Sequence, residues 1–278
     1  MKQLSANVIN NSEILPYMAR PDARTILGTR IIWFRCPEIA QEAKPGQFVM
    51  VRCGEELILP RPFSIHQVND KGDMALFFAV WEDGKGTRWL SQRKAGDNID
   101  LLGPLGNGFS LNPASQNLLL VAGGIGIAPL YFLAQEALNR GCPVTLLLGA
   151  RTAPQLYPER LLLPGIKLIT ATEDGTTGER GRVSELLPNF TDRADQVFAC
   201  GPMAMYRDMA DKYHHLLKHK PVQVSLEMRM GCGRGVCYGC TVKTKSGLRQ
   251  VCKDGPVFDL EDICWDELNL AAGGNKPW

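Results

Sequence analysis

The sequence has almost no excess charge, no long uninterrupted apolar run and no internal repeat. Its 278 residues include 31 Lys and Arg against 29 Asp and Glu, a balance that favours neither nucleic acid nor an anionic membrane surface as a partner. The longest apolar stretch, residues 118–134, contains three glycines and a proline, so it is typical of strand, turn and helix rather than a membrane span. The polar first ten residues lack the apolar core of a signal peptide, and we expect a soluble cytoplasmic protein.

The composition is that of a folded, two-domain chain with an unusual cysteine cluster. Apolar residues make up 45% and charged residues 22%, which permits a sizeable core. At roughly 100–200 residues per domain, the length predicts about two domains and a small additional segment. Four of nine cysteines lie within residues 232–252, which indicates metal or redox chemistry in a cytosolic protein rather than a disulfide framework. No role is predicted for Cys36, Cys53, Cys142 and Cys264.

Short apolar runs separated by turn residues dominate the first 110 residues. A short helix is expected at residues 87–93. Strands are expected at residues 25–35, 48–52, 63–68, 74–81 and 98–102. This regular spacing predicts an antiparallel barrel or sandwich, and we assign residues 1–110 to it.

Strand and helix patterns alternate in the next part of the chain, residues 111–224. Buried strands are expected at residues 117–122, 144–149, 167–172 and 196–200, with helices at 129–139 and 203–217. The alternation predicts a doubly wound parallel sheet. The remaining residues, 225–278, are rich in glycine and cysteine and then acidic. A segment so short buries little apolar surface, and we expect it to need a metal centre to hold its shape.

The clustered cysteines follow the spacing C-x4-C-x2-C-x11-C. The four residues are Cys232, Cys237, Cys240 and Cys252. Three thiols on one glycine-rich loop and a fourth downstream are typical of a plant-type [2Fe–2S] site. Structural zinc usually takes two separated ligand pairs instead. The pattern favours a [2Fe–2S] cluster, with zinc and plain buried thiols as the alternatives.

Two segments of the first domain indicate flavin binding when taken together. Residues 61–64 read Arg-Pro-Phe-Ser, which offers a guanidinium for a pyrophosphate and a hydroxyl for the edge of a flavin ring. Residues 82–87 form a glycine turn before a short helix, and free N–H groups there can bind phosphate. Each alone is as consistent with an ordinary strand start or hairpin turn.

The second domain contains a glycine turn at the position that a dinucleotide requires. Residues 123–128 follow a buried strand and open a helix, so that backbone N–H groups can face a pyrophosphate. A tight structural turn is the alternative, because the strict G-x-G-x-x-G pattern is only partly met. Cys200 and Gly201 close the last predicted parallel strand, where a thiol could lie beside a nicotinamide or be simply a small buried apolar group. Glu173 and Asp174 end another strand and weakly favour NAD over NADP, although a solvated turn explains them equally.

The order of these segments resembles the ferredoxin-reductase superfamily, and more closely the family of electron-transfer subunits of dihydroorotate dehydrogenase B. The resemblance covers nearly the whole chain and is weakest over the first 15 residues and the last dozen. Its most specific part is the cysteine segment. The segments are R-P-F-S (61–64), G-K-G-T (84–87), G-G-I-G-I-A-P-L (123–130), C-G-P-M (200–203), S-L-E-M-R-M-G-C-G-R-G-V-C-Y-G-C (225–240) and K-D-G-P-V-F (253–258).

The resemblance implies an FAD-binding antiparallel β-barrel, a doubly wound NAD-binding domain and a small C-terminal [2Fe–2S] domain. It implies that Arg61 lies near the flavin phosphates and Ser64 near the flavin ring. The full FAD-binding set would be Arg61, Pro62, Phe63, Ser64, Ala79, Val80, Trp81, Gly86 and Thr87. The NADH pyrophosphate would lie against Gly123, Gly124, Ile125 and Gly126, the nicotinamide near Cys200 and Gly201, and the cluster on Cys232, Cys237, Cys240 and Cys252. No acid–base residue beyond the cofactors is required of this chain.

The resemblance also implies a partner, a TIM-barrel subunit carrying FMN that oxidises dihydroorotate to orotate in pyrimidine biosynthesis. Two such pairs would form a heterotetramer. NADH delivers electrons in pairs and a [2Fe–2S] cluster accepts them singly, so FAD would stand between them. Related subunits serving sulfite reduction or ferredoxin-linked transhydrogenation, a stand-alone NADH diaphorase, and a non-catalytic zinc-containing binding module are the alternatives.

Basic residues surround the cysteine segment and could form a docking face for an acidic partner or a plain solvated surface. Glu227 is the lone acid among them. The basic residues are Arg229, Arg234, Lys243, Lys245, Arg249 and Lys253.

Overall fold

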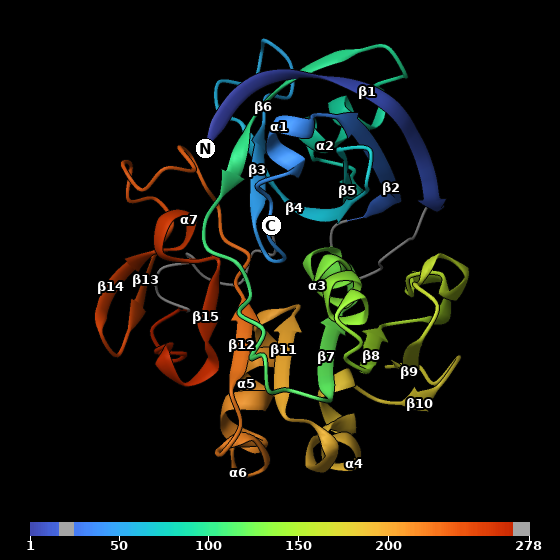
Figure 1. Ribbon diagram of the computed structural model, residues 1–278, viewed down its shortest axis with the longest axis vertical. Helices are drawn as coiled ribbons and strands as arrows, with labels where there is room; N and C mark the ends of the chain where they lie inside the picture. The colour runs from blue at the N-terminus through green and yellow to red at the C-terminus, as the bar shows by residue number, and fades with distance from the viewer. Residues whose placement is uncertain (17–24, 269–278) are drawn as a thin grey trace.

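The chain forms a closed barrel, a mixed sheet and a small hairpin (Figure 1). The computed structural model describes residues 1–16 and 25–268. In the view of Figure 1 the barrel lies at the top, the sheet below it, and the hairpin at the left. None of the described helices is long and apolar enough to cross a membrane.

Six antiparallel strands close the barrel in the order β1-β2-β5-β4-β3-β6. They are β1 (Lys2–Leu15), β2 (Ile26–Arg35), β3 (Phe48–Val51), β4 (Arg61–Val68), β5 (Asp73–Trp81) and β6 (Asn98–Leu105). Alternate side chains of a strand face opposite sides, so Phe63, Ile65, Phe78 and Val80 pack inside the barrel. The predicted antiparallel barrel is confirmed, with helices α1 (Pro37–Ala40) and α2 (Lys85–Ser91) beside it.

Five of the six barrel strands are predicted from the sequence, and β1 is not. The reason is its polar composition, because only Ala6 and Val8 among its 14 residues are buried. Its pairing with both β2 and β6 nevertheless closes the barrel. Backbone pairing, rather than apolar burial, therefore defines this strand.

The sheet has seven strands in the order β10-β9-β8-β7-β11-β12-β15. The strands are β7 (Leu118–Gly123), β8 (Val144–Ala150), β9 (Ile166–Thr172), β10 (Glu179–Arg180), β11 (Gln196–Cys200), β12 (Val222–Ser225) and β15 (Val257–Asp259). All neighbours are parallel except β12 and β15, which are antiparallel. The predicted parallel sheet is confirmed, and the carboxyl ends of its parallel strands point toward the barrel (Figure 1).

Helix α3 (Ile127–Asn139) lies between the barrel and the sheet (Figure 1) and packs on β4 as well as β7. The helical stretch expected at residues 203–217 is present, but it is not one regular α-helix. The structure divides it into α5 (Met203–Arg207), a π-helical turn at Asp208–Lys212, and α6 (His214–Leu217). The division arises because the Tyr213 N–H bonds to the Asp208 carbonyl five residues earlier, which inserts one residue into the helical turn.

The cysteine segment is built onto the sheet rather than set apart from it. It contains β13 (Thr241–Thr244), β14 (Gly247–Gln250) and α7 (Val251–Asp254), and its last strand, β15, completes the large sheet. Its buried cysteines belong to one apolar cluster with Met50 of the barrel and Val224 of the sheet. Trp265 stacks on Tyr206 with ring centroids 5.4 Å apart. The segment thus shares an apolar core with both larger parts of the fold.

Candidate functional site

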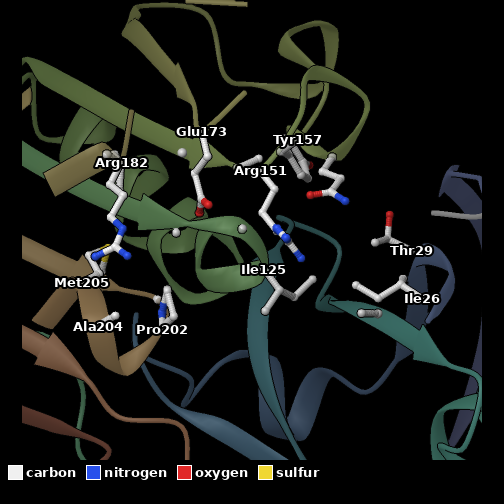
Figure 2. Close-up of a pocket in the computed structure, with 18 of the residues that line it drawn as sticks. Ile26, Thr29, Ile125, Arg151, Tyr157, Glu173, Arg182, Pro202, Ala204 and Met205 are labelled. Atoms are coloured by element: carbon white, nitrogen blue, oxygen red, sulfur yellow. The ribbon is translucent and has the colours of Figure 1, made fainter. Parts of the chain in front are cut away.

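A cavity of about 400 Å³ lies where the outer wall of the barrel faces the carboxyl edge of the sheet (Figure 2). On the barrel side it is lined by Phe77, Ala79 and Trp81, alternate residues of β5. Since Phe78 and Val80 between them face the barrel core, strand alternation alone presents this wall outward. The opposite wall comes from the loops after β7, β8, β9 and β11.

Several of the predicted cofactor-binding residues meet in this cavity. Those that line it are Ala79, Trp81, Gly123, Gly124, Ile125 and Gly201. Phe63 and Val80 point into the barrel core, so only their backbone atoms are available to a flavin. Pro62 and Ser64 alternate with Phe63 and therefore face outward from β4.

The two predicted dinucleotide segments pack directly against each other. A Cβ atom on Gly126 would overlap the carbonyl of Cys200, and one on Gly201 would come within 3.0 Å of the Gly123 backbone. Glycine is needed here because no side chain fits between the two turns. Gly126 and Cys200 do not line the cavity themselves, and they support the turn beneath its surface.

Arg61, Gly86 and Thr87 form a second group outside the cavity lining, at the start of α2. A Cβ atom on Gly86 would lie 3.0 Å from Cγ of Arg61, so the two residues are in contact. The Trp81 N–H donates to Oγ1 of Thr87 (3.2 Å), and that hydroxyl donates to the Gly84 carbonyl (3.1 Å). These bonds fix the turn before α2 and place a guanidinium beside it, an arrangement suited to a pyrophosphate.

Three charged side chains point into the cavity, Arg151, Glu173 and Arg182 (Figure 2). Glu173 follows β9, and its N–H is bonded to the carbonyl of Ala150 at the end of β8. Asp174, in contrast, accepts hydrogen bonds from the Thr176 hydroxyl and backbone N–H, which lower the pKa of its carboxyl. The predicted acidic pair is thus divided, with Glu173 available to a ligand and Asp174 committed to its own turn.

Glu227 also lines the cavity, and not the surface around the cysteines as expected from its neighbours in the sequence. Its side chain is solvent-exposed, and partial desolvation by the protein around it raises the pKa of the carboxyl. Next to it, the Tyr206 hydroxyl accepts the Gly201 N–H (2.9 Å) and donates to the Ser225 carbonyl (2.6 Å). Tyr206 thereby ties together the ends of β11 and β12. Burial raises the pKa of the Cys200 thiol well above its usual range, so it stays neutral.

The four clustered cysteines lie on the loop before β13 and on α7. Backbone N–H groups point at three of the sulfurs: Gly235 donates to Cys252 (3.1 Å), Arg234 to Cys232 (3.4 Å), and Cys252 itself to Cys240 (3.4 Å). Such donors are what thiolate ligands of a cluster require. Burial works to raise the pKa of the Cys232 thiol, but N–H groups from Arg234, Cys237 and Val236 lower it to about 6.

The four clustered thiols differ in exposure. Cys240 and Cys252 are buried and Cys237 is exposed. Among the described residues, no three His, Cys, Asp or Glu side chains converge on a point where one ion could bind. The donor set itself, three thiols on one glycine-rich loop and a fourth on α7, fits a [2Fe–2S] cluster.

The cysteine loop packs against strand β3 of the barrel. Gly233 has a φ of +68° and approaches Met50 so closely that an added Cβ would lie 2.6 Å from its Cγ. Met50 is paired with Pro62 across β3 and β4. The loop that holds the thiols therefore packs on the strand next to the Arg-Pro-Phe-Ser segment.

The remaining thiols and basic residues have ordinary positions. Burial raises the pKa of Cys36 to about 12 and that of Cys53 to about 11, and both lie in the barrel core. Lys243 is paired with Glu267 (2.7 Å), and the aliphatic part of Lys253 covers Gly235. The other predicted basic residues are exposed, namely Arg229, Arg234, Lys245 and Arg249.

Comparison with protein families finds three matching domains along the chain. Residues 26–109 match an oxidoreductase FAD-binding domain and residues 120–211 an oxidoreductase NAD-binding domain. Residues 227–264 match the iron–sulfur cluster binding domain of dihydroorotate dehydrogenase B, and this range holds all four clustered cysteines. The dihydroorotate dehydrogenase B (NAD(+)) electron transfer subunit of Desulforamulus reducens is 39% identical over 94% of this chain and 100% of that protein. The chain belongs to this family of electron transfer subunits.

Other relatives agree with the assignment. The electron transfer subunit of Bacillus caldolyticus is 38% identical, over 81% of this chain and 88% of its own. Among solved structures, an NADH-dependent reduced ferredoxin–NADP oxidoreductase superposes with a TM-score of 0.81 at 30% identity, over 96% of this chain and 92% of that one. A ferredoxin–NADP⁺ reductase from Neisseria gonorrhoeae shares the fold, with a TM-score of 0.63 at 19% identity over 78% and 92% of the two chains.

The family assignment confirms the predicted cofactors, FAD, a [2Fe–2S] cluster and NAD(H), and identifies the chain as an NAD-dependent flavin and iron–sulfur oxidoreductase subunit. The residues that hold each cofactor remain predictions. Arg151, Arg182 and Tyr157 of this electron transfer subunit were not predicted, because nothing in the sequence distinguishes them from other residues of surface loops. Only the position of Arg151 directly after a buried strand could have indicated the cavity.

Proposed function

We propose that this subunit moves electrons between NAD(H) and an FMN-containing catalytic subunit, and that together they convert dihydroorotate and NAD⁺ to orotate and NADH. One observation carries the proposal: the cysteine loop packs through Gly233 on Met50, which pairs with Pro62 of the predicted flavin segment. When bound, FAD exchanges electrons in pairs with NAD(H) and singly with the cluster. The short connection between the two sites supports an electron path through the barrel wall.

In this proposal, residues of the chain bind the flavin, the dinucleotide and the cluster and orient them. Arg61 and the turn at Gly86 hold the flavin pyrophosphate, and the outward faces of β4 and β5 carry the flavin ring. The turn at Gly123–Gly126 holds the dinucleotide, and Glu173 accepts hydrogen bonds from its adenosine ribose. Cys232, Cys237, Cys240 and Cys252 ligate the cluster. We also propose that residues 1–110 form the FAD-binding domain, residues 111–224 the NAD-binding domain, and residues 225–278 the cluster-binding segment.

We further propose that the catalytic subunit docks on the surface around Cys237. Val236 and Tyr238 flank this exposed thiol and are 70% and 66% exposed, and Leu248 on β14 is 65% exposed. Tyr238 has a φ of +56°, in the region where a non-glycine residue is costly. Exposed Arg234 and Arg249 border these apolar groups. The expected partner surface is apolar at its centre and acidic at its rim, and we propose an assembly of two subunits of each kind.

Reconstitution with the catalytic subunit tests the proposal. The purified chain is mixed with an FMN-containing dihydroorotate dehydrogenase subunit, and NADH formation from dihydroorotate and NAD⁺ is followed at 340 nm. We expect NADH formation only when both subunits are present, and light scattering should give the mass of a 2:2 complex. An NADH–dye reductase activity that persists while dihydroorotate never reduces NAD⁺ would contradict the proposed partner.

A second candidate function follows from the structural likeness to the NADH-dependent reduced ferredoxin–NADP oxidoreductase. In that function the same cofactors would serve a ferredoxin-linked partner. Replacing the catalytic subunit by reduced ferredoxin in the same assay distinguishes the two. Rapid reduction of NAD⁺ by ferredoxin, without any response to dihydroorotate, would favour the second candidate.

A further inference from the structure

His66 is a completely buried polar side chain, and neither the predicted electron path nor the cofactor sites give it a role. It lies on β4 two residues after Ser64, where the pairing with β5 is irregular. Its ring packs against Phe77 and Tyr157, which line the cavity outside the barrel. There it meets the first turn of α3 and the loop after β8. A buried imidazole is costly unless its nitrogens are satisfied, and both are.

The hydrogen bonds of His66 determine its protonation. Nδ1 lies 2.9 Å from the carbonyl oxygen of Ala128, which can only accept, so Nδ1 carries the proton. Nε2 lies 3.1 Å from the Tyr157 hydroxyl, which donates to it. Burial lowers the pKa of the imidazole to about 4, and the ring is neutral at physiological pH.

These two bonds join three parts of the fold that meet beside the cavity. His66 belongs to the barrel strand of the flavin segment. Ala128 directly follows the glycine turn of the dinucleotide site. Tyr157 lines the cavity, as does Phe77, and their rings meet edge to face with centroids 5.0 Å apart. A fully satisfied buried polar network of this kind permits one arrangement of the parts it connects.

We propose that His66 is a positioning residue for hydride transfer, which fixes the dinucleotide turn and the Tyr157 loop relative to the flavin-bearing face of β4. The proposal rests on the function proposed above. Hydride transfer is sensitive to position because a displacement of about 1 Å can slow a reaction on the order of 100-fold. His66 contacts neither reacting group and acts through Ala128 and Tyr157.

Two variants remove the same hydrogen bond from opposite sides. Tyr157→Phe deletes the donor hydroxyl and keeps the ring. His66→Asn keeps an N–H donor on the side of Ala128 and deletes the acceptor for Tyr157. Tyr131→Phe is the matched control, because Tyr131 packs on His66 with centroids 4.5 Å apart but donates its hydroxyl to the Leu161 carbonyl.

The measurement is anaerobic stopped-flow reduction of the flavin by NADH, with and without deuterium at the transferred position. We expect Tyr157→Phe and His66→Asn each to slow flavin reduction by about tenfold and to increase the isotope effect. The double variant should be no slower than either single variant, since all remove one bond. Tyr131→Phe should reduce at the wild-type rate.

The outcomes separate positioning from a structural role. A lower melting temperature with an unchanged rate and isotope effect would show that His66 only stabilises the fold and would overturn the proposal. Additive losses in the double variant would also overturn it. Wild-type protein whose flavin NADH does not reduce would instead refute the proposed function, a result that the variants cannot mimic.

Discussion

We propose that a single side chain at the edge of the sheet, Glu173, determines which dinucleotide the subunit accepts. Glu173 points into the cavity between Arg151 and Arg182 (Figure 2). The two arginines could bind the phosphates of a dinucleotide, including a 2′-phosphate, whereas the carboxylate favours a ribose diol and repels a 2′-phosphate. We therefore expect the preference for NADH over NADPH to depend on Glu173.

Replacing Glu173 by Gln should weaken this discrimination. We expect the ratio of kcat/KM for NADH to that for NADPH to fall by about tenfold, because about 1.4 kcal/mol of charge repulsion is lost. Steady-state dye reduction with both nucleotides measures the ratio. Asp174→Asn is the control, since the Asp174 carboxylate is bound to Thr176, and an equal change in this variant would refute the role of Glu173.

The burial of His66 also predicts how the stability of the protein changes with pH. The pKa of His66 in the folded chain, about 4, lies below its ordinary value of 6.5. Between these pH values the unfolded chain therefore binds a proton at this imidazole that the folded chain does not bind. This contribution is fully present above pH 6.5 and is lost as the pH falls toward 4. Between pH 7 and pH 5 the loss is about 2 kcal/mol of unfolding free energy.

Urea unfolding of the wild type and His66→Asn at both pH values measures this term. Other titrating groups are common to both proteins and cancel in the comparison. The variant should lose about 2 kcal/mol less than the wild type between pH 7 and pH 5. Parallel losses in the two proteins would show that His66 does not titrate as its burial requires.

At the scale of elements, the strands and turns that the sequence predicts are those marked by a regular apolar pattern or by glycine. Strands β7, β8 and β11 are predicted because they are buried on both faces. Strand β9 is predicted from its apolar residues, although most of it is only half-buried. β1 is missed because its sequence is polar, and β12 and β15 because short strands leave little pattern. The position of Glu227 is also missed, since its neighbours in the sequence surround the cysteines while its side chain faces the cavity. Such placements depend on tertiary packing that no local pattern reports.

The glycine loop around the cysteines gives a prediction at this scale. Gly235 has a φ of +78°, donates its N–H to Cys252, and lies so close to Lys253 that an added Cβ would approach Cδ within 2.7 Å. Gly235→Ala should cost about 1–2 kcal/mol of backbone strain and displace this donor. We expect a lower iron content and an altered electron paramagnetic resonance spectrum.

Gly247→Ala is the control that separates displacement of the Gly235 N–H donor from backbone strain alone. Gly247 also has a positive φ, +110°, but no atom lies within 4 Å of its added Cβ. Its strand, β14, contains no cysteine. This variant should keep the wild-type iron content and spectrum. Equal iron loss in both variants would show that general strain, rather than the Gly235 donor, explains the effect.

At the scale of the whole molecule, the barrel, the sheet and the cysteine segment share one apolar cluster, which holds the two proposed sites together. The cluster site opens to solvent at Cys237, beside the strained and exposed Tyr238. Tyr238→Gly removes both ring and strain. We expect it to weaken binding of the catalytic subunit more than tenfold, as loss of an aromatic anchor does, without slowing flavin reduction by NADH.

Tyr238→Phe, which keeps the ring, should bind nearly as the wild type does. Calorimetric titration of each variant with the catalytic subunit gives the affinities. Unchanged affinity of Tyr238→Gly would place the docking surface elsewhere on the molecule.

The most direct test of the proposed electron path is anaerobic titration of the purified subunit with NADH, followed by absorption and low-temperature electron paramagnetic resonance spectroscopy. We expect bleaching of the flavin band together with a rhombic [2Fe–2S] signal, because in the proposed path electrons reach the cluster through the flavin. A bleached flavin without any cluster signal in protein that contains two irons per chain would contradict the electron path. Zinc in place of iron would contradict the assignment of the cysteines.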